Sequence, residues 1–284
     1  MKRRWGALAL VLLCARAEAS PCGDPRDAAG GPLAGGTDGA DYGAIPEACA
    51  GTDLALRLRG TLLVARDAPD FYGNASGTAT LRLRHRLFRS DWIWLSVAVD
   101  VTTFRYVANA VVTSHDFSFG PATLGIHRAL GAWERAAATI YARGLLPLDT
   151  ARSEGARMGL EVGATARQIL GARGRFGVEG GAALLAPVVI VAGQTHWTLE
   201  PAGLAQAWFA PKPRLAFALG ASTRAEVSPN PAFFTLAPRA SARLTTARGL
   251  AFSLLAEAPV LGSDRTDLVV ALFAGWSAPA LSPP

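Results

Sequence analysis

The chain has 284 residues, of which 50% are hydrophobic, and its formal net charge is +6 at pH 7. No internal apolar run approaches the about 18 residues that a transmembrane helix needs. The positive charge is small and is not interleaved with aromatic residues, so no nucleic-acid partner is expected. High apolar content without long apolar runs is instead typical of alternating strands.

Residues 1–19 have the pattern of a secretory signal peptide. Lys2–Arg4 form a positive start, Ala7–Ala15 form an apolar core, and Ala17–Ala19 form a small-residue cleavage motif. This order of charge, apolar core and small residues is read by the export machinery and then removed. We therefore expect an exported chain that begins near Ser20.

The segment 20–52 that follows is rich in Gly and Asp and has almost no hydrophobic pattern. It contains Cys22 and Cys49, the two cysteines left after cleavage, and an even count in an exported chain predicts a disulfide. No histidine lies near them, so no metal site is expected. The segment is either a stapled loop or a plug or periplasmic cap, and the weak pattern favours the loop.

From Thr52 to Trp276 apolar and polar residues alternate with a period of two, which is typical of β-strands with two different faces. The clearest case is the hairpin formed by 77–88 and 91–106. The alternation predicts twelve strands at 53–66, 77–88, 91–106, 121–130, 133–146, 157–170, from 175 onward, 197–209, 214–226, 234–246, 250–260 and 267–276. Short and long gaps between them alternate almost throughout.

In this pattern residues 53–276 resemble a bacterial outer-membrane β-barrel, which has an even strand number, short periplasmic turns and longer outer loops. The resemblance implies an all-β fold: a closed, transmembrane, antiparallel up-and-down β-barrel of about twelve strands in the bacterial outer membrane. Ala, Leu and Val would face lipid, and Arg and Thr would face the lumen. Trp276, before a tail of 277–284, is similar to the aromatic signal that the barrel-assembly machinery recognises.

Several aromatic residues lie near the short-turn end of the predicted barrel. We expect them to form the periplasmic aromatic girdle that such barrels place at the lipid interface. The tryptophans of this set are Trp92, Trp133, Trp208 and Trp276.

The polar face of the predicted strands is strongly basic, with twelve arginines against four carboxylates. The residues expected to line a pore are Arg57, Arg59, Arg82, Arg84, Arg86, Asp100, Arg135, Arg143, Arg157, Glu161, Arg167, Glu179, Arg224, Arg239, Arg243 and Glu257. At strand ends the same face also carries Asp53, Glu226 and Asp267, which reduce the excess of arginines over carboxylates. A basic lumen between walls of low dielectric favours anions.

The sequence does not predict an enzyme, a cofactor or a metal. It has no His-Glu-x-x-His or Gly-x-Ser-x-Gly motif, and the adjacent residues Ser114, His115 and Asp116 cannot act on one another as a triad. We expect a narrow pore for small polar or anionic solutes by passive diffusion. The alternatives are a non-conducting structural or surface barrel, a soluble exported β-sandwich and a membrane-lipid hydrolase.

Overall fold

The structure is a computed structural model. The residues that it describes lie almost entirely in the strand-forming part of the chain. The described residues are 53–65, 72–86, 93–107, 118–132, 135–146, 156–170, 175–191, 194–227, 234–246, 250–261 and 268–279. Side chains are described mainly between residues 122 and 274. The predicted signal peptide and the segment 20–52, with its predicted disulfide, lie outside the described residues.

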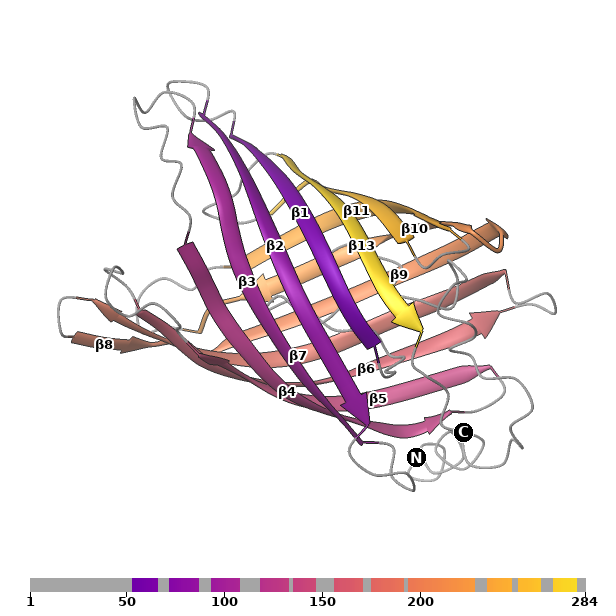
Figure 1. Ribbon diagram of the computed structural model, residues 1–284, viewed down its shortest axis with the longest axis horizontal. Helices are drawn as coiled ribbons and strands as arrows, with labels where there is room; N and C mark the ends of the chain where they lie inside the picture. Colours follow the sequence, from indigo (N-terminus) through magenta and orange to yellow (C-terminus); the bar gives the residue numbers. More distant parts are fainter. Residues whose placement is uncertain are drawn as a thin grey trace, which may run out of the picture.

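The described residues form thirteen strands of one antiparallel sheet (Figure 1). They are β1 (Asp53–Ala65), β2 (Tyr72–Arg86), β3 (Ile93–Val107), β4 (Ser118–Ala132), β5 (Ala136–Leu146), β6 (Ala156–Leu170), β7 (Phe176–Val191), β8 (Gln194–Trp197), β9 (Glu200–Lys212), β10 (Leu215–Ala225), β11 (Phe234–Thr245), β12 (Leu250–Glu257) and β13 (Leu268–Pro279).

The strand pairs run round a ring. Strands that are neighbours in the chain pair with each other, except that the short β8 pairs with the end of β7, and β7 continues its pairing with β9. β6 pairs with β7 over most of their length, and β1 pairs with β13. Leaving out β8, twelve strands therefore form a closed up-and-down barrel, as the alternation predicted.

The two faces of the barrel wall differ in chemistry. In β5 buried and more exposed residues alternate one by one, as the period of two requires, with Thr139 and Arg143 buried and Ile140 exposed. Large exposed apolar side chains cover the outer face, and they include Leu124, Ile126, Leu130, Ile140, Met158, Leu160, Val162, Val178, Leu184, Leu219, Leu244, Leu254 and Leu272. A ring without edges and with an apolar outside is the β-structure that lipid tolerates. A soluble sandwich would bury that face, so this alternative is wrong.

The connections define the two ends of the barrel. From β3 onward they alternate, with long gaps at 108–117, 147–155, 226–233 and 258–267 and short gaps at 133–135, 171–175, 213–214 and 246–249. The gaps 66–71 and 87–92 are of equal length, which differs from the predicted long and short pair. We call the two sides the long-loop end and the short-turn end. β1 begins at the short-turn end.

Most strand ends differ from the prediction by a few residues, and three of the differences change the assignment of a segment. β2 begins at Tyr72 instead of Gly77, β8 occupies part of the predicted gap 191–196, and β13 continues past Trp276 to Pro279. These additions lie at strand ends, where the backbone pairing continues past the alternating pattern. Residues 277–279, which were assigned to the predicted tail of 277–284, therefore belong to β13.

Within the described ranges no helix is long and apolar enough to cross a membrane.

Candidate functional site in the barrel interior

The inner surface of the barrel, which we call the lumen face, is lined by buried polar side chains. Backbone register carries this face from strand to strand, because residues that pair across an antiparallel sheet point to the same side. The buried polar set is Thr123, His127, Thr139, Arg143, Glu161, Thr165, Arg167, Glu179, Glu200, Gln206, Arg239, Ser241, Arg243 and Thr245.

The centre of the β5–β6 wall holds a two-point ion pair. Register places Arg143 opposite Glu161, and neither side chain is exposed (0% each). Arg143 Nε donates to Glu161 Oε2 over 2.7 Å, and Arg143 Nη2 donates to Glu161 Oε1 over 2.7 Å. Tyr141 Oη donates to the same Oε1 over 2.8 Å. The planar guanidinium matches the carboxylate in both positions, so this pair is geometrically fixed.

Tyr141 is held flat against the wall by a glycine. It pairs with Gly163, where an added Cβ would lie 2.5 Å from Tyr141 Oη and 2.7 Å from the carbonyl oxygen of Ala182. The ring of His127 stacks on Tyr141 with centroids 5.9 Å apart, and Arg143 lies 5.4 Å from the ring centroid. A side chain at Gly163 would push Tyr141 off the wall, so this glycine positions the carboxylate's third donor.

Trp208 repeats this arrangement on the neighbouring strands. It pairs with Gly177, whose added Cβ would lie 2.5 Å from the indole, and the guanidinium of Arg167 lies 4.5 Å from the ring centroid. Trp208 is 1% exposed. The prediction that Trp208 belongs to the lipid-facing girdle is therefore wrong, because its register shares the lumen face with Gln206.

A looser cluster lies on β10, β11 and β12. Arg239 pairs in register with Glu257, and their charged atoms are 3.7 Å apart. Ser222 Oγ donates to Glu257 Oε1 over 3.0 Å. Arg243, a second predicted pore-lining residue, is buried four residues further along β11 on the same face.

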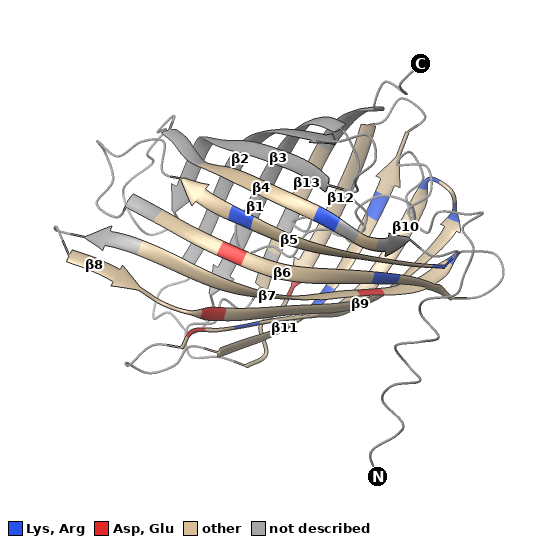
Figure 2. Cartoon of the chain, turned by 90° about the horizontal axis from the view of Figure 1, so that it is seen from below, with Lys and Arg blue, Asp and Glu red and all other residues tan. Residues whose placement is uncertain are grey.

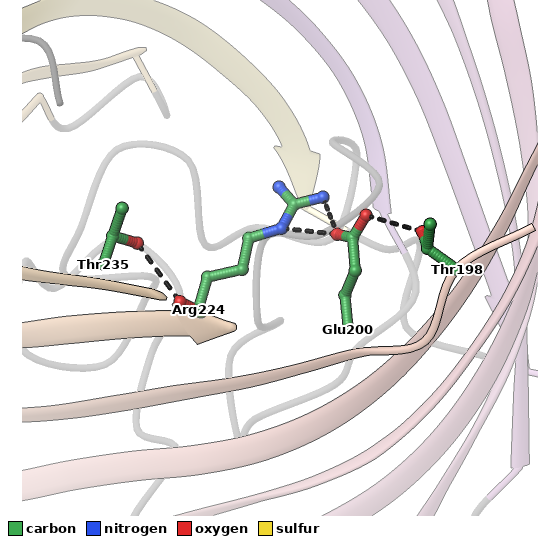
Figure 3. A network of polar contacts seen from close by, with 4 residues as sticks. All are labelled: Thr198, Glu200, Arg224 and Thr235. Atoms are coloured by element: carbon green, nitrogen blue, oxygen red, sulfur yellow. Dashed lines mark hydrogen bonds and ion pairs between the residues drawn. The ribbon is translucent and has the colours of Figure 1, made fainter. Parts of the chain in front are cut away.

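The long-loop end of the lumen carries a second ion pair, drawn in Figure 3. Arg224 on β10 reaches Glu200 at the start of β9, and Arg224 Nε donates to Glu200 Oε2 over 2.6 Å. Thr198 Oγ1 donates to Glu200 Oε1 over 3.2 Å, and Thr235 Oγ1 donates to the carbonyl oxygen of Arg224 over 3.4 Å. Arg224 is 44% exposed, so this pair is in contact with water.

Apolar side chains also reach the lumen face, which the sequence did not predict. Leu185 and Leu204 pack with Tyr141 and the small residues Ala183 and Ala202, and Leu185 is 0% exposed. Each of these leucines shares its register face with Glu200 or Gln206. The polar neighbour two positions away was the signal that could have identified Leu204.

Among the described side chains of the lumen wall, five arginines stand against four carboxylates; Figure 2 shows that charges of both signs lie along the described strands. Arg143, Arg167, Arg239 and Arg243 are buried, Arg224 is half exposed, and the carboxylates on the same face are Glu161, Glu179, Glu200 and Glu257. Register places Arg167 opposite Glu179. Glu200 was missed because the predicted strand covering it was the least regular. Arg135 is exposed at the short-turn end.

The other predicted lining residues lie where the backbone is described but the side chains are not. On β2 and β3 the backbone pairs Thr80 with Asp100, Arg82 with Ala98 and Arg84 with Ser96. The same face continues on β4, where it includes the buried Thr123 and His127. The register positions that belong to the lumen face are those of Arg57, Arg59, Arg82, Arg84, Arg86, Asp100 and Arg157. Whether these residues line a pore stays a prediction.

Phenylalanines form the aromatic row on the outer face at the short-turn end. Phe176 pairs with Phe209, which pairs with Phe217, and all three are exposed. Trp276 occupies an outer-face register opposite Leu250. Trp92 and Trp133, of the predicted girdle, lie outside the described residues. The row fits a lipid interface, where aromatic rings with one apolar side are favoured.

In the described part of the chain no three His, Cys, Asp or Glu side chains gather as a metal site would require. Ser114, His115 and Asp116 lie outside that part. The lumen face presents guanidinium groups and hydroxyls, which are groups that can attract anions and replace part of their hydration.

No protein-family model matches the sequence, and no curated protein matches it. Solved structures do match. An outer membrane channel from Pseudomonas putida F1 has a TM-score of 0.65 at 10% identity over 84% of this chain and 99% of that chain. The translocator domain of the autotransporter NalP from Neisseria meningitidis has a TM-score of 0.47 at 11% identity over 85% of this chain and 91% of that chain. The NanC porin has a TM-score of 0.47 at 8% identity over 78% of this chain and 97% of that chain. This chain has the channel-like β-barrel fold of bacterial outer-membrane proteins.

Proposed function

We propose that this chain is a narrow outer-membrane pore that passes small polar or anionic solutes by passive diffusion. The proposal assigns no catalytic step to the barrel. Solutes would move along the lumen face, attracted by fixed positive charge inside a wall of low dielectric.

The observation that carries the proposal is the uneven distribution of charge round the ring. On β5 to β12 the lumen-face arginines share their wall with four carboxylates, and two of the ion pairs there are direct. On β1 and β2 the lumen-face register holds five arginine positions, and Asp53 and Asp100 are the acidic positions of that face on β1 to β3. A solute path along β1 and β2 would therefore carry net positive charge.

The test is the reversal potential of single channels in a planar bilayer under a KCl gradient. It is recorded for the mature chain and for a chain that begins at Thr52, so that the preceding segment does not limit the result. We expect discrete openings that prefer anions. Replacing Arg82, Arg84 and Arg86 together by Gln should move the reversal potential towards zero, because the fixed charge that selects anions is removed.

The matched control is Arg128→Gln, which removes one guanidinium from the exposed outer face of β4. This variant should leave the reversal potential unchanged. Openings that prefer cations would contradict the charge argument. No openings from either chain would favour the non-conducting barrel instead.

A further inference from the structure

The same edge of the guanidinium group, formed by Nε and Nη2, can be compared in three arginines of the lumen face. Arg143 holds Glu161 through these two nitrogens, and Arg224 holds Glu200 through the same two. In Arg239 neither nitrogen has a hydrogen-bond acceptor among the described residues. The Arg239 side chain is only 7% exposed, so bulk water does not satisfy this edge.

The carboxylate that pairs with Arg239 leaves this edge open. Glu257 lies 3.7 Å from Nη1, which is outside the edge and too far for a hydrogen bond. Its Oε1 instead accepts a hydrogen bond from Ser222 Oγ over 3.0 Å. Buried donors normally have partners, and an exception needs an explanation. The Nε–Nη2 edge of Arg239 is therefore a donor pair inside the barrel that the described side chains do not use.

The wall beside Arg239 is bare of side chains on one flank. Register runs from Gln206 on β9 through Gly220 on β10 to Arg239 on β11. Gly220 cannot carry a side chain, because an added Cβ would lie 2.6 Å from Cα of Gln206 and closer still to the backbone oxygen of Ala205. Bare backbone therefore separates the register positions of Arg239 and Gln206, whose amide group is a further donor.

The chemistry of the edge selects the ligand. Two parallel N–H groups match the two oxygens of a carboxylate or another oxyanion. Arg239 and Arg243 lie on the lumen face of β11, and Glu257 pairs with Arg239. Glu179 also lies within electrostatic reach of Arg239, and its register partner is Arg167. Three arginines against two carboxylates leave one net positive charge, which suits a monoanion better than a dianion.

We propose that Arg239 is a binding site for the carboxylate of a small monoanionic solute, held side-on by Nε and Nη2 beside Gly220. At this site the guanidinium group replaces part of the water around the anion. That such a solute meets the site in transport rests on the proposed function. The donor edge itself does not.

Binding is measured without conduction, from the fluorine NMR line width of trifluoroacetate in the presence of the refolded mature chain in detergent micelles. Trifluoroacetamide, which has a similar shape and no charge, is the control for partition into the micelle. We expect the chain to broaden the trifluoroacetate line, and to broaden the trifluoroacetamide line no more than empty micelles do.

Two substitutions test the donor edge. Arg239→Lys keeps the positive charge and loses the paired nitrogens, whereas Arg239→Gln loses both. Each should weaken trifluoroacetate binding about tenfold or more, because a charge-assisted hydrogen bond is lost. Arg128→Gln, which removes a guanidinium from the exposed outer face of β4, is the matched control and should bind as the parent chain does. Parent-like binding by both Arg239 variants would overturn the proposal.

A third substitution tests the site through a gain of binding, which loss of folding cannot imitate. Glu257→Gln removes a competing negative charge, and its amide oxygen can still accept from Ser222. Trifluoroacetate should bind about threefold more tightly or better, because a like charge beside an anion is unfavourable. Unchanged or weaker binding would contradict the placement of the anion beside Arg239.

Conductance separates the site from the pore. A silent chain that binds trifluoroacetate through Arg239 would refute the pore and keep the site. Anion-selective openings, with binding that does not depend on Arg239, would keep the pore and refute the site. If both hold, trifluoroacetate should reduce the chloride current of the parent channel more than that of Arg239→Lys.

Discussion

The barrel contains two ion pairs of the same residue types in opposite surroundings. Arg143 and Glu161 lie fully buried at the middle of the β5–β6 wall, whereas Arg224 and Glu200 lie at the long-loop end, where Arg224 is 44% exposed. Water screens the second pair and is excluded from the first. Removing one partner should therefore be costly at the first place, where it leaves a buried charge unpaired, and cost little at the second.

The largest effect is expected from Glu161→Gln. The substitution leaves the buried Arg143 guanidinium without its carboxylate and weakens the acceptor of Tyr141. Breaking one partner of a buried pair costs about 3–5 kcal/mol. The measurement is guanidinium unfolding of the refolded chain in phospholipid vesicles, followed by tryptophan fluorescence.

A double variant, Arg143→Met with Glu161→Leu, is the control for that loss. Because it removes both charges and keeps the volume, its stability should lie close to that of the parent chain. If Glu161→Gln were as stable as the parent chain, water would have access to the Arg143–Glu161 pair. The two ion pairs would then not differ in their exposure to water.

A smaller effect is expected from Gly163→Ala. The added methyl group meets Tyr141 and the backbone of Ala182 at under 3 Å, so the ring must leave the wall. Overpacking of this kind costs about 1–3 kcal/mol. Gly144→Ala is the matched change, because its Cβ would approach nothing closer than 3.9 Å. Equal stability of the two variants in the same unfolding assay would contradict the packing of Tyr141 on Gly163.

The smallest effect is expected from Glu200→Gln at the long-loop end. An ion pair that is open to water contributes about 0–1 kcal/mol, and salt reduces this further. The free energy of unfolding is measured for Glu200→Gln and the parent chain at low and at high ionic strength. The difference between the two chains should be small at low ionic strength and should vanish at high ionic strength. A loss as large as that of Glu161→Gln would show that Arg224 and Glu200 are shielded from water.

Alternation along the chain was sufficient to predict the barrel, because a strand between lipid and a polar lumen must change character at every residue. The polar face of β5, with Thr139, Tyr141 and Arg143, was predicted correctly for this reason. The same rule predicted the exposed apolar residues of β4 and β6. On the regular strand β5 the alternation therefore identified the buried Arg143, although it did not identify its partner Glu161.

The interior was less predictable where two neighbours are both apolar or both aromatic. Trp208 and Phe209 are adjacent, so a strand can turn one of them to the lipid and the other to the lumen, and composition does not say which. Leu184 and Leu185 present the same ambiguity. Irregular pairing at Leu215/Phe217 and on β2, β3 and β4 also shifts which residues of a strand face the lumen and which face outward. These assignments needed the pairing of neighbouring strands.

The seam between β1 and β13 has a consequence for how the molecule is made. Leu56 lies opposite Trp276, so the two strands that close the ring come from opposite ends of the strand-forming chain. Contacts of such large sequence separation form slowly, and an unclosed sheet keeps two edges that can pair with other chains. The ring therefore cannot close until β13 is available to pair with β1. Until β13 pairs with β1, the open edges of the sheet must be protected from aggregation.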